Sequence, residues 1–354
     1  LVMTRRDFLS TGALLGASLS VLPGRALAKD DVVSTTAAAS DRGAGGTAAA
    51  SEVRFSAFAD IHYYPRVFPH DSREWLEQIL DRATREKVDF VIHAGDFTHK
   101  PREFSDYVNW YNDYSLPTYH CIGNHDDDGN SHDVTLECYR LQCGHYFFDR
   151  KGFRFIVADP NYFLQDGIYT HYSASNYYKI GTSYVPPEQL EWLKDAIGNS
   201  PYPCVIFSHQ SFEREIGGCK NYAEVRKIIN DANAAHPGRV RLVINGHHHR
   251  DNLRLIDGVL YFDLNSANYE WVAKAHDKYP PDVLARHSLA KNTVMYNDPI
   301  NAIITMNSDG RIKIDGMESS LFMGITREMT GNPRYDAHGR DTTARVQSLD
   351  ITLN

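Results

Sequence analysis

Side chains that can bind metal ions stand directly after five apolar segments of this sequence. The segments are VRFSAFA, VDFVIHA, PTYHCI, PCVIFS and VRLVIN, and each is short and apolar enough to be a buried β-strand. The residues that follow them are Asp60-Ile61-His62, Gly95-Asp96, Gly123-Asn124-His125-Asp126, His209 and Gly246-His247-His248-His249. In α/β sheets, ligands bind at the carboxyl ends of the strands, so all five ends can face one crevice. The pattern predicts a polynuclear metal site.

The spacing within two of these motifs supports that prediction. If the chain is still extended there, residues i and i+2 lie on the same side, so Asp60 and His62 can reach one crevice, and so can His247 and His249. Mixed nitrogen and oxygen donors favour Zn, Mn or Fe over Ca or Mg. One carboxylate can bridge two ions about 3.5 to 4 Å apart. We therefore expect two divalent transition-metal ions (Fe, Mn or Zn) with an aspartate between them.

The motifs D-x-H, G-D, G-N-H-D, H and G-H-x-H, in this order, resemble those of the calcineurin-like metallophosphoesterase superfamily. The resemblance runs from about Val53 to Ile314. It implies an α/β fold, a four-layer αββα sandwich in which two mixed β-sheets are flanked by helices, with a dinuclear metal site at the carboxyl ends of the strands. It also implies that Asp96 bridges the two metals. The implied ligands of the first metal are Asp60, His62 and His249, and those of the second are Asn124, His209 and His247.

The same resemblance implies roles for residues beside the ligands. His125 is expected to face the substrate and to protonate or stabilise the leaving group, which departs when a metal-bridging hydroxide attacks the phosphorus. Asp126 is expected to orient the His125 imidazole. His248 occupies a variable position and points away. His99 stands where purple acid phosphatases carry a tyrosine, and those enzymes lack a counterpart of His62, so we expect no tyrosinate colour.

For other polar residues, the sequence predicts less specific roles. His93 and His120 lie within apolar segments, where they are core residues or support the ligands. Asn265 is a candidate for contact with the ligands. The candidates for lining the pocket are His99, His132, His145 and His276. The tyrosines are expected to pack or to lie at the surface, although one of Tyr63 and Tyr64 can border the substrate. The five cysteines form no CxxC pair. The sequence does not decide whether Cys138 and Cys143 form a disulfide.

The elements that must position these residues alternate along the chain. Helical periodicity is present in residues 71–87, from Pro186 onward and in YAEVRKIINDANAA, between the apolar strand segments. Strands alternating with helices indicate an α/β domain. No linker-like break follows Glu52, so residues 53–354 are predicted to form one metallophosphoesterase domain.

The residues before this domain predict export. Arg5 and Arg6 precede an apolar run that is too short to span a bilayer, and Ala26-Leu27-Ala28 offers a cleavage site, so residues 1–28 resemble a bacterial twin-arginine signal peptide. Residues 29–52, rich in Ala, Gly, Ser and Thr, are expected to form a flexible linker. We therefore expect a partnership with the twin-arginine export machinery, a periplasmic or secreted location, and no membrane association after the signal is removed.

The charge and composition of the chain restrict the classes of substrate that it can bind. The formal charge of -8 and the absence of a Lys/Arg-rich stretch disfavour duplex nucleic acid as a partner, because binding it requires a surface that neutralises phosphates. A small phosphoester is expected, and the resemblance extends to class III cyclic nucleotide and glycerophosphodiester phosphodiesterases. A periplasmic phosphomonoesterase or nucleotidase is the alternative. A non-catalytic metal- or phosphoester-binding protein on the same scaffold is the alternative from another class. The oligomeric state stays open.

Overall fold

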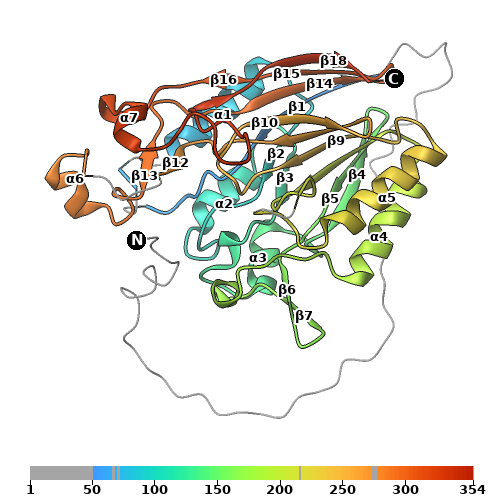
Figure 1. Ribbon diagram of the computed structural model, residues 1–354, viewed down its shortest axis with the longest axis horizontal. Coiled ribbons are helices and arrows are strands. Elements are labelled where there is room, and N and C mark those ends of the chain that lie inside the picture. Colours follow the sequence, from blue (N-terminus) through green and yellow to red (C-terminus); the bar gives the residue numbers. More distant parts are fainter. Residues whose placement is uncertain (1–50, 66–67, 70–71, 215–216, 273–276, 354) are drawn as a thin grey trace. The chain divides into compact units, whose positions relative to one another are not determined.

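The structure is a computed structural model that describes residues 51–65, 68–69, 72–214, 217–272 and 277–353 (Figure 1). The described residues all belong to one compact unit, Ala38–Asn354. The predicted signal peptide (1–28), nearly all of the predicted linker (29–52) and His276 lie outside the described residues, so the expectations about them stay predictions.

The first of two six-stranded sheets has the order β18-β15-β14-β1-β2-β3. The strands β1, β2 and β3 are parallel, and the other pairs are antiparallel, so the sheet is mixed. Its strands are β1 (Glu52–Phe58), β2 (Phe90–Ala94), β3 (Thr118–Cys121), β14 (Ala302–Asn307), β15 (Arg311–Asp315) and β18 (Leu349–Thr352).

The second sheet has the order β10-β11-β9-β8-β5-β4 and is also mixed. Its four central strands are parallel, and β10 and β4 are antiparallel strands at its edges. Its strands are β4 (Tyr146–Arg150), β5 (Phe153–Val157), β8 (Cys204–Ser208), β9 (Val240–Asn245), β10 (Asn252–Ile256) and β11 (Val259–Asp263). The five apolar segments of the sequence analysis are thus β1, β2 and β3 of one sheet and β8 and β9 of the other.

The two sheets pack face to face through one apolar core. Side chains of alternate strand residues point into it, because successive residues of a strand face opposite sides. Phe55 of β1 and Phe155 of β5 are fully buried there, with ring centroids 5.4 Å apart. Burying aromatic rings from both sheets in one core holds the sheets together. It thereby keeps the carboxyl ends of their parallel strands at a fixed separation.

Helices cover the outer face of each sheet (Figure 1). The outer face of the first sheet is covered by α1 (Ser72–Arg85), α2 (Ser105–Asn112) and α3 (His132–Tyr139), and that of the second by α4 (Pro187–Gly198) and α5 (Tyr222–Ala235). Helix α1, for example, buries Trp75, Leu76, Ile79 and Leu80 along one stripe, as its periodicity predicted. The expected four-layer αββα sandwich is confirmed.

Shorter elements lie in the connections. A hairpin of β6 (Tyr162–Gln165) and β7 (Ile168–His171) is at the lower edge of Figure 1. The other short elements are the 3₁₀ helices η2 (His125–Asp127), η3 (Asn176–Lys179) and η4 (Phe322–Gly324), the strands β12 (Tyr269–Trp271), β13 (Thr293–Met295), β16 (Met317–Glu318) and β17 (Arg345–Val346), and the helices α6 (Pro281–Arg286) and α7 (Arg327–Thr330). All five cysteines are free, including Cys138 and Cys143. Within the described ranges, every helix is too short or too polar to cross a bilayer.

Candidate metal centre

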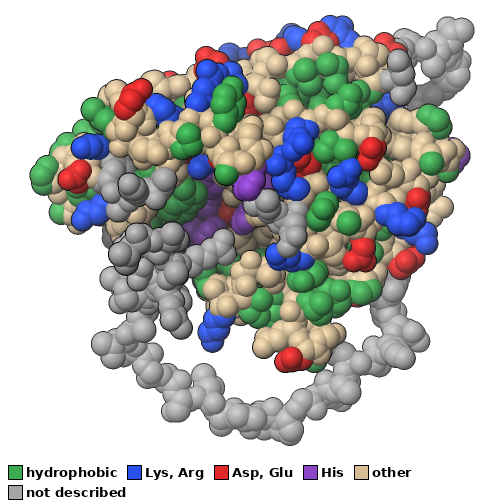
Figure 2. All heavy atoms as spheres, in the orientation of Figure 1, with side chains coloured by type: hydrophobic (Ala, Val, Ile, Leu, Met, Phe, Trp, Pro, Cys, Tyr) green, Lys and Arg blue, Asp and Glu red, His purple; other side chains and the backbone are tan. Residues whose placement is uncertain are grey.

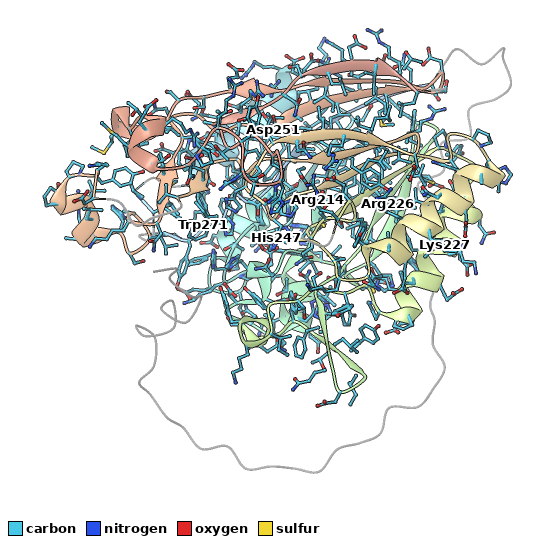
Figure 3. The ribbon with its side chains drawn as sticks, viewed as in Figure 1. Arg214, Arg226, Lys227, His247, Asp251 and Trp271 are labelled. Carbon is cyan, nitrogen blue, oxygen red and sulfur yellow. The ribbon has the colours of Figure 1, made fainter. Side chains whose placement is uncertain are left out.

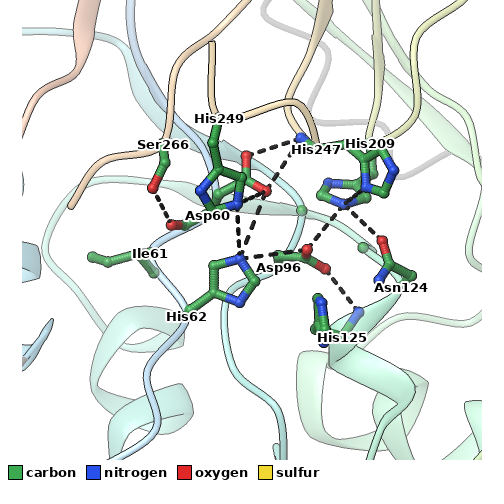
Figure 4. Close-up of polar contacts among 12 residues, drawn as sticks. Asp60, Ile61, His62, Asp96, Asn124, His125, His209, His247, His249 and Ser266 are labelled. Atoms are coloured by element: carbon green, nitrogen blue, oxygen red, sulfur yellow. Dashed lines mark hydrogen bonds and ion pairs between the residues drawn. The ribbon is translucent and has the colours of Figure 1, made fainter. Parts of the chain in front are cut away.

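The loops after β1, β2, β3, β8 and β9 meet at one site and bring the seven predicted ligands together (Figure 4). Backbone hydrogen bonds tie the first two loops to each other: the Asp60 amide donates to the Gly95 carbonyl at 3.0 Å, and the His62 amide donates to the Asp96 carbonyl at 2.9 Å. On the surface, histidine side chains lie in a hollow of the face shown in Figure 2. The site therefore draws its donors from both sheets.

The first set of donors is Asp60, His62 and His249, all buried. The His249 Nε2 atom lies 3.3 Å from Asp60 Oδ1 and 3.2 Å from the Nε2 atom of His62. Nδ1 of His249 lies 3.2 Å from the carbonyl oxygen of Tyr269, which can only accept, so Nδ1 donates its N–H there. The Nε2 atom of His249 consequently presents a lone pair to the other two side chains.

His62 is oriented in the same way by His99. Nδ1 of His99 lies 3.0 Å from the Asp128 carboxylate, and Nε2 of His99 lies 3.0 Å from Nδ1 of His62. Burial lowers the pKa of His99, so the ring is neutral and its Nε2 accepts from His62. The Nε2 atom of His62 is then also unprotonated. In this tautomer two nitrogen lone pairs face each other at 3.2 Å beside the Asp60 carboxylate, an arrangement that a divalent cation would satisfy.

The second set repeats this arrangement around His209. Its Nδ1 atom donates to the Ala94 carbonyl at 2.9 Å. Its Nε2 atom faces three acceptors: Asp96 Oδ2 at 3.1 Å, Asn124 Oδ1 at 3.1 Å and His247 Nδ1 at 3.2 Å. Burial would lower the pKa of His209, but the carboxylates of Asp96 and Asp60 raise it to about 9. In other words, this site attracts a positive charge, which a divalent ion supplies better than a proton.

Asp96 lies between the two sets. Its Oδ2 atom is 3.1 Å from Nε2 of His209 and 3.5 Å from Nε2 of His62, and its Oδ1 atom accepts the backbone N–H of His125 at 2.8 Å. One carboxylate oxygen therefore contacts a nitrogen of each set. This is the position that a bridging ligand needs, and the donor chemistry of the described residues fits two divalent ions.

The backbone at the ligands is unusual. Five of the seven predicted ligands have positive φ angles: Asp60 (51°), His62 (45°), Asp96 (52°), His247 (70°) and His249 (50°). Residues other than glycine rarely adopt this left-handed backbone conformation, and those that do cluster at functional sites. The expectation that D-x-H and H-x-H are still extended is therefore wrong. Each chain turns sharply at the strand end, and the side chains reach one site through left-handed residues instead.

Glycines make the close approach of the loops possible. Gly95 has a φ of +92°, and a Cβ atom on it would lie 2.2 Å from Nδ1 of His209. A Cβ atom on Gly123 would lie 2.2 Å from both the backbone nitrogen and Oδ1 of Asp96. Any larger residue at these two positions would push His209 or Asp96 out of place.

The His125 imidazole lies beside His62 of the first set, with ring centroids 5.0 Å apart, and it is also close to Asp96. Its Nδ1 atom lies 2.6 Å from Oδ2 of Asp128 and 3.2 Å from the hydroxyl of Tyr178. The Asp128 carboxylate is itself held by the hydroxyl of Tyr177 at 2.7 Å. The His125 side chain keeps 18% of its surface exposed, whereas the ligand His209 is fully buried. An incoming molecule can therefore reach His125.

The expected role of Asp126 is corrected by the structure. Its carboxylate accepts the backbone N–H groups of Phe97 (2.9 Å), Thr98 (2.9 Å) and Gly123 (2.8 Å), and the hydroxyl of Tyr139 (2.6 Å). It thus holds the loops of Asp96 and Asn124 in place and does not contact the His125 imidazole. The physical reason is the 3₁₀ turn η2, in which residues i and i+3 lie on one face, so Asp128 and not Asp126 lies beside His125.

Four other residues singled out in the sequence, His93, His120, His248 and Asn265, do not contribute donor atoms to the two sets. His93 and His120 form a buried pair, with Nε2 of His93 2.7 Å from Nδ1 of His120. His248 points away to Asp263 at 3.1 Å. The Asn265 amide donates to the carbonyls of Thr343 and Arg345, away from the ligands.

Several supporting residues were not predicted. Ser266 Oγ donates to the Asp60 carbonyl at 2.8 Å, and Asn268 Nδ2 donates to the Ile61 carbonyl at 2.5 Å. Trp271, labelled with His247 in Figure 3, has its ring centroid 6.0 Å from that of His249. Tyr177 and Tyr178 reach His125 and Asp128 from η3, about fifty residues away in sequence. The spacing of Tyr177 and Tyr178 carries no signal of this contact, whereas Ser266 and Asn268 follow β11 in the polar run NSAN, which could have indicated them.

Comparison with known proteins agrees with this fold. The family model described as calcineurin-like phosphoesterase matches residues 53–251, more than half of the chain. A crystal structure of a dimetal phosphatase from Danio rerio is similar, with a TM-score of 0.56 and 15% identity, over 85% of this chain and 99% of that chain. A putative 5′-nucleotidase from Staphylococcus aureus has a TM-score of 0.42 and 14% identity, over 79% of this chain and 57% of that chain. No curated protein sequence matches this chain.

Proposed function

The chain belongs to the calcineurin-like phosphoesterase family and is a metal-dependent phosphoester hydrolase, and we propose that it hydrolyses small phosphodiesters at a dinuclear centre held by the seven ligands. The observation that carries this proposal is the position of Asp96, whose Oδ2 atom contacts one nitrogen of each ligand set. When bound, two divalent ions at such a centre would supply charge neutralisation of the phosphate and activation of a water molecule.

The protein side chains have their own tasks. The carbonyls of Ala94 and Tyr269 accept from Nδ1 of His209 and of His249, and His99 accepts from Nδ1 of His62, so each of these three rings turns its Nε2 atom toward the metal positions. His125 is placed to hold a proton for the leaving oxygen, since its Nδ1 atom is engaged by Asp128 and its Nε2 atom stays available. Asp128 favours the protonated ring and fixes its orientation.

We place phosphodiesters before phosphomonoesters on electrostatic grounds. A diester carries one negative charge at neutral pH, whereas a monoester approaches two. The groups that contact Nδ1 of His125 are a carboxylate (Asp128) and phenol hydroxyls (Tyr177 and Tyr178), which do not compensate a second charge. The resemblance to class III cyclic nucleotide and glycerophosphodiester phosphodiesterases supports the same order. A phosphomonoesterase or nucleotidase is the alternative within the enzyme class.

A substrate panel tests this proposal. The protein, reconstituted separately with Mn, Zn and Fe, is assayed on nitrophenyl mono- and diesters, glycerophosphodiesters, cyclic nucleotides and nucleoside monophosphates. We expect higher kcat/KM values for diesters and no turnover by Asp96→Asn. Faster turnover of monoesters would favour the phosphatase alternative. If protein with both ions bound hydrolyses none of the diesters in the panel, the proposed diester preference is wrong.

We also propose that the enzyme is exported and works in the periplasm or outside the cell. Support comes from the twin arginines Arg5 and Arg6, the short apolar run after them and the Ala26-Leu27-Ala28 site. The variant with Arg5→Lys and Arg6→Lys should accumulate as precursor in the cytoplasm, because the export machinery reads the arginine pair. Immunoblots of cell fractions measure this, and normal processing of the variant would contradict twin-arginine export.

A further inference from the structure

A second group of metal-binding side chains shares no residue with the dinuclear centre. It consists of Asp127 at the end of η2, His132 at the start of α3, Asp159 just after β5 and His171 at the end of β7. The ligand atoms of Asp127, His132 and His171 lie within 4.8 Å of one another. Four separate elements of the fold thus converge on one point.

The two imidazoles lie side by side between the two carboxylates. Their ring centroids are 3.5 Å apart, with planes inclined by 31°. The Nδ1 atoms face Asp127 Oδ2, at 3.3 Å from His132 and 4.0 Å from His171. The Nε2 atoms face Asp159 Oδ2, at 3.8 Å from His132 and 2.7 Å from His171. Both rings are therefore turned the same way, with Nδ1 toward Asp127 and Nε2 toward Asp159.

The carboxylate of Asp127 is the group that needs a further partner. Asp127 is fully buried, and its Oδ1 atom has no hydrogen-bond partner among the described residues. A buried charge without sufficient partners is costly. Asp159, by contrast, is well satisfied, because it also accepts from the backbone N–H of Asn161 at 3.2 Å and from its side-chain amide at 2.7 Å.

We propose that Asp127, His132 and His171 bind a further divalent cation, most suitably Zn²⁺, and that Asp159 orients the two histidines. Donor atoms about 2.0 to 2.2 Å from one zinc ion lie roughly 3.3 to 4.4 Å from each other, and the Oδ2–Nδ1 separations fall in this range. Histidine ligands of metals commonly donate their other N–H to a carboxylate, and Asp159 Oδ2 has this position for His171 at 2.7 Å, while Nε2 of His132 lies 3.8 Å from it. Without an ion, Nδ1 of His171 donates to the carbonyl oxygen of Tyr172 at 2.8 Å, so binding the cation would replace this N–H···O hydrogen bond with a nitrogen–metal bond.

This ion would brace the substrate side of the active site. It joins η2 and α3 to the β6–β7 hairpin, and η3 with Tyr177 and Tyr178 follows that hairpin directly. The backbone already links these segments, since the Ser175 amide donates to the Asp127 carbonyl at 3.2 Å and the Ala174 amide to the Asn130 carbonyl at 2.7 Å. The cation would fix the start of the segment that carries the tyrosines on Asp128 and His125.

Zinc stoichiometry tests the proposal on the full chain, independently of any hydrolytic activity. After saturation with Zn²⁺ and gel filtration, we expect about three ions in the wild type, two in His132→Gln and in His171→Gln, and one in Asp96→Asn. The exposed His236 provides a matched control, and His236→Gln should keep three. Asp127→Asn, which preserves the side-chain volume, should also bind two.

Two outcomes overturn the proposal. In the first, the wild type binds only two ions and Asp96→Asn binds none, which would mean that a proton on His171 satisfies the cluster. In the second, His132→Gln, His171→Gln and Asp127→Asn all retain the third ion, which would place it elsewhere. Failure of the proposed phosphodiesterase activity would leave these stoichiometries unchanged, so the two proposals fail separately.

Discussion

Nδ1 of His125 lies 2.6 Å from Oδ2 of Asp128, three residues further along the chain. The same Asp128 oxygen is 3.0 Å from His99, whose other nitrogen is 3.0 Å from the ligand His62. A continuous chain of hydrogen bonds therefore connects the residue that faces the substrate with the first set of metal ligands. Asp128 orients both ends of it.

Removing the His125 imidazole should matter most for poor leaving groups. A positioned acid typically contributes about 10²- to 10⁴-fold, and a nitrophenolate departs with little help. His125→Ala should therefore lose far more kcat/KM on an alkyl or nucleoside ester than on a nitrophenyl ester, with both catalytic ions retained. The measurement is kcat/KM on both substrates together with metal content. Equal losses accompanied by metal depletion would show that His125 only helps to hold an ion.

The neighbouring aspartates should give different phenotypes. Asp128→Asn removes the carboxylate that orients His125, so kcat/KM on an alkyl ester should fall by about 10- to 100-fold. Because this carboxylate also accepts from His99 and Tyr177, the melting temperature should fall as well. Asp126→Asn replaces Oδ2, which accepts the backbone N–H of Gly123, with an NH₂ donor, so it should lower the free energy of unfolding by about 1 to 3 kcal/mol. The exposed Asp133→Asn is the matched control. The opposite pattern would restore Asp126 as the residue that orients His125.

The bridging position of Asp96 should show in metal affinity. Asp96→Asn weakens both ligand sets, whereas His62→Ala removes one ligand of one set. At limiting metal, Asp96→Asn should lose both catalytic ions and all activity, and His62→Ala should keep the ion held by His209 and His247. Metal titration followed by calorimetry and turnover distinguishes the two. Wild-type activity in Asp96→Asn would exclude Asp96 from the centre.

The buried pair of His93 and His120 should make stability depend on pH. Burial, with a smaller effect of Arg140, lowers the pKa of His120 to about 3. Below pH 6.5 the unfolded chain takes up a proton there that the folded chain does not, so stability falls as the pH falls. The free energy of unfolding should decrease by about 1.4 kcal/mol per pH unit from this residue, between about pH 6 and pH 4.

Replacing His120 isolates that contribution. In His120→Gln the stability should be lower at pH 7, because hydrogen bonds to His93 and Asn112 are lost, but the difference from the wild type should shrink at pH 5. Denaturant unfolding at both pH values, at fixed metal content, measures this difference. A constant difference between the two pH values would mean that His120 titrates alike in the folded and unfolded chains.

The sequence by itself identified the local features of this protein. The strands β1, β2, β3, β8 and β9 were recognisable because each is a short apolar run, and helix α1 because its buried residues recur at helical spacing. The donor residues after those strands were recognisable because metal chemistry restricts the residue types. The order of the motifs then indicated the family and the four-layer fold.

Only the tertiary structure showed the backbone conformation at the ligands and the contacts between segments that are far apart in the sequence. The D-x-H and H-x-H segments were expected to be extended, but their ligand residues have left-handed backbone conformations. The loops must turn sharply there so that ligands from both sheets reach one centre. A 3₁₀ turn placed Asp128, and not Asp126, beside His125. Tyr177 and Ser266 meet the site only because separate elements fold against it. These contacts join residues that are far apart in the sequence. They could not be predicted from local spacing, because the packing of separate elements brings the residues together.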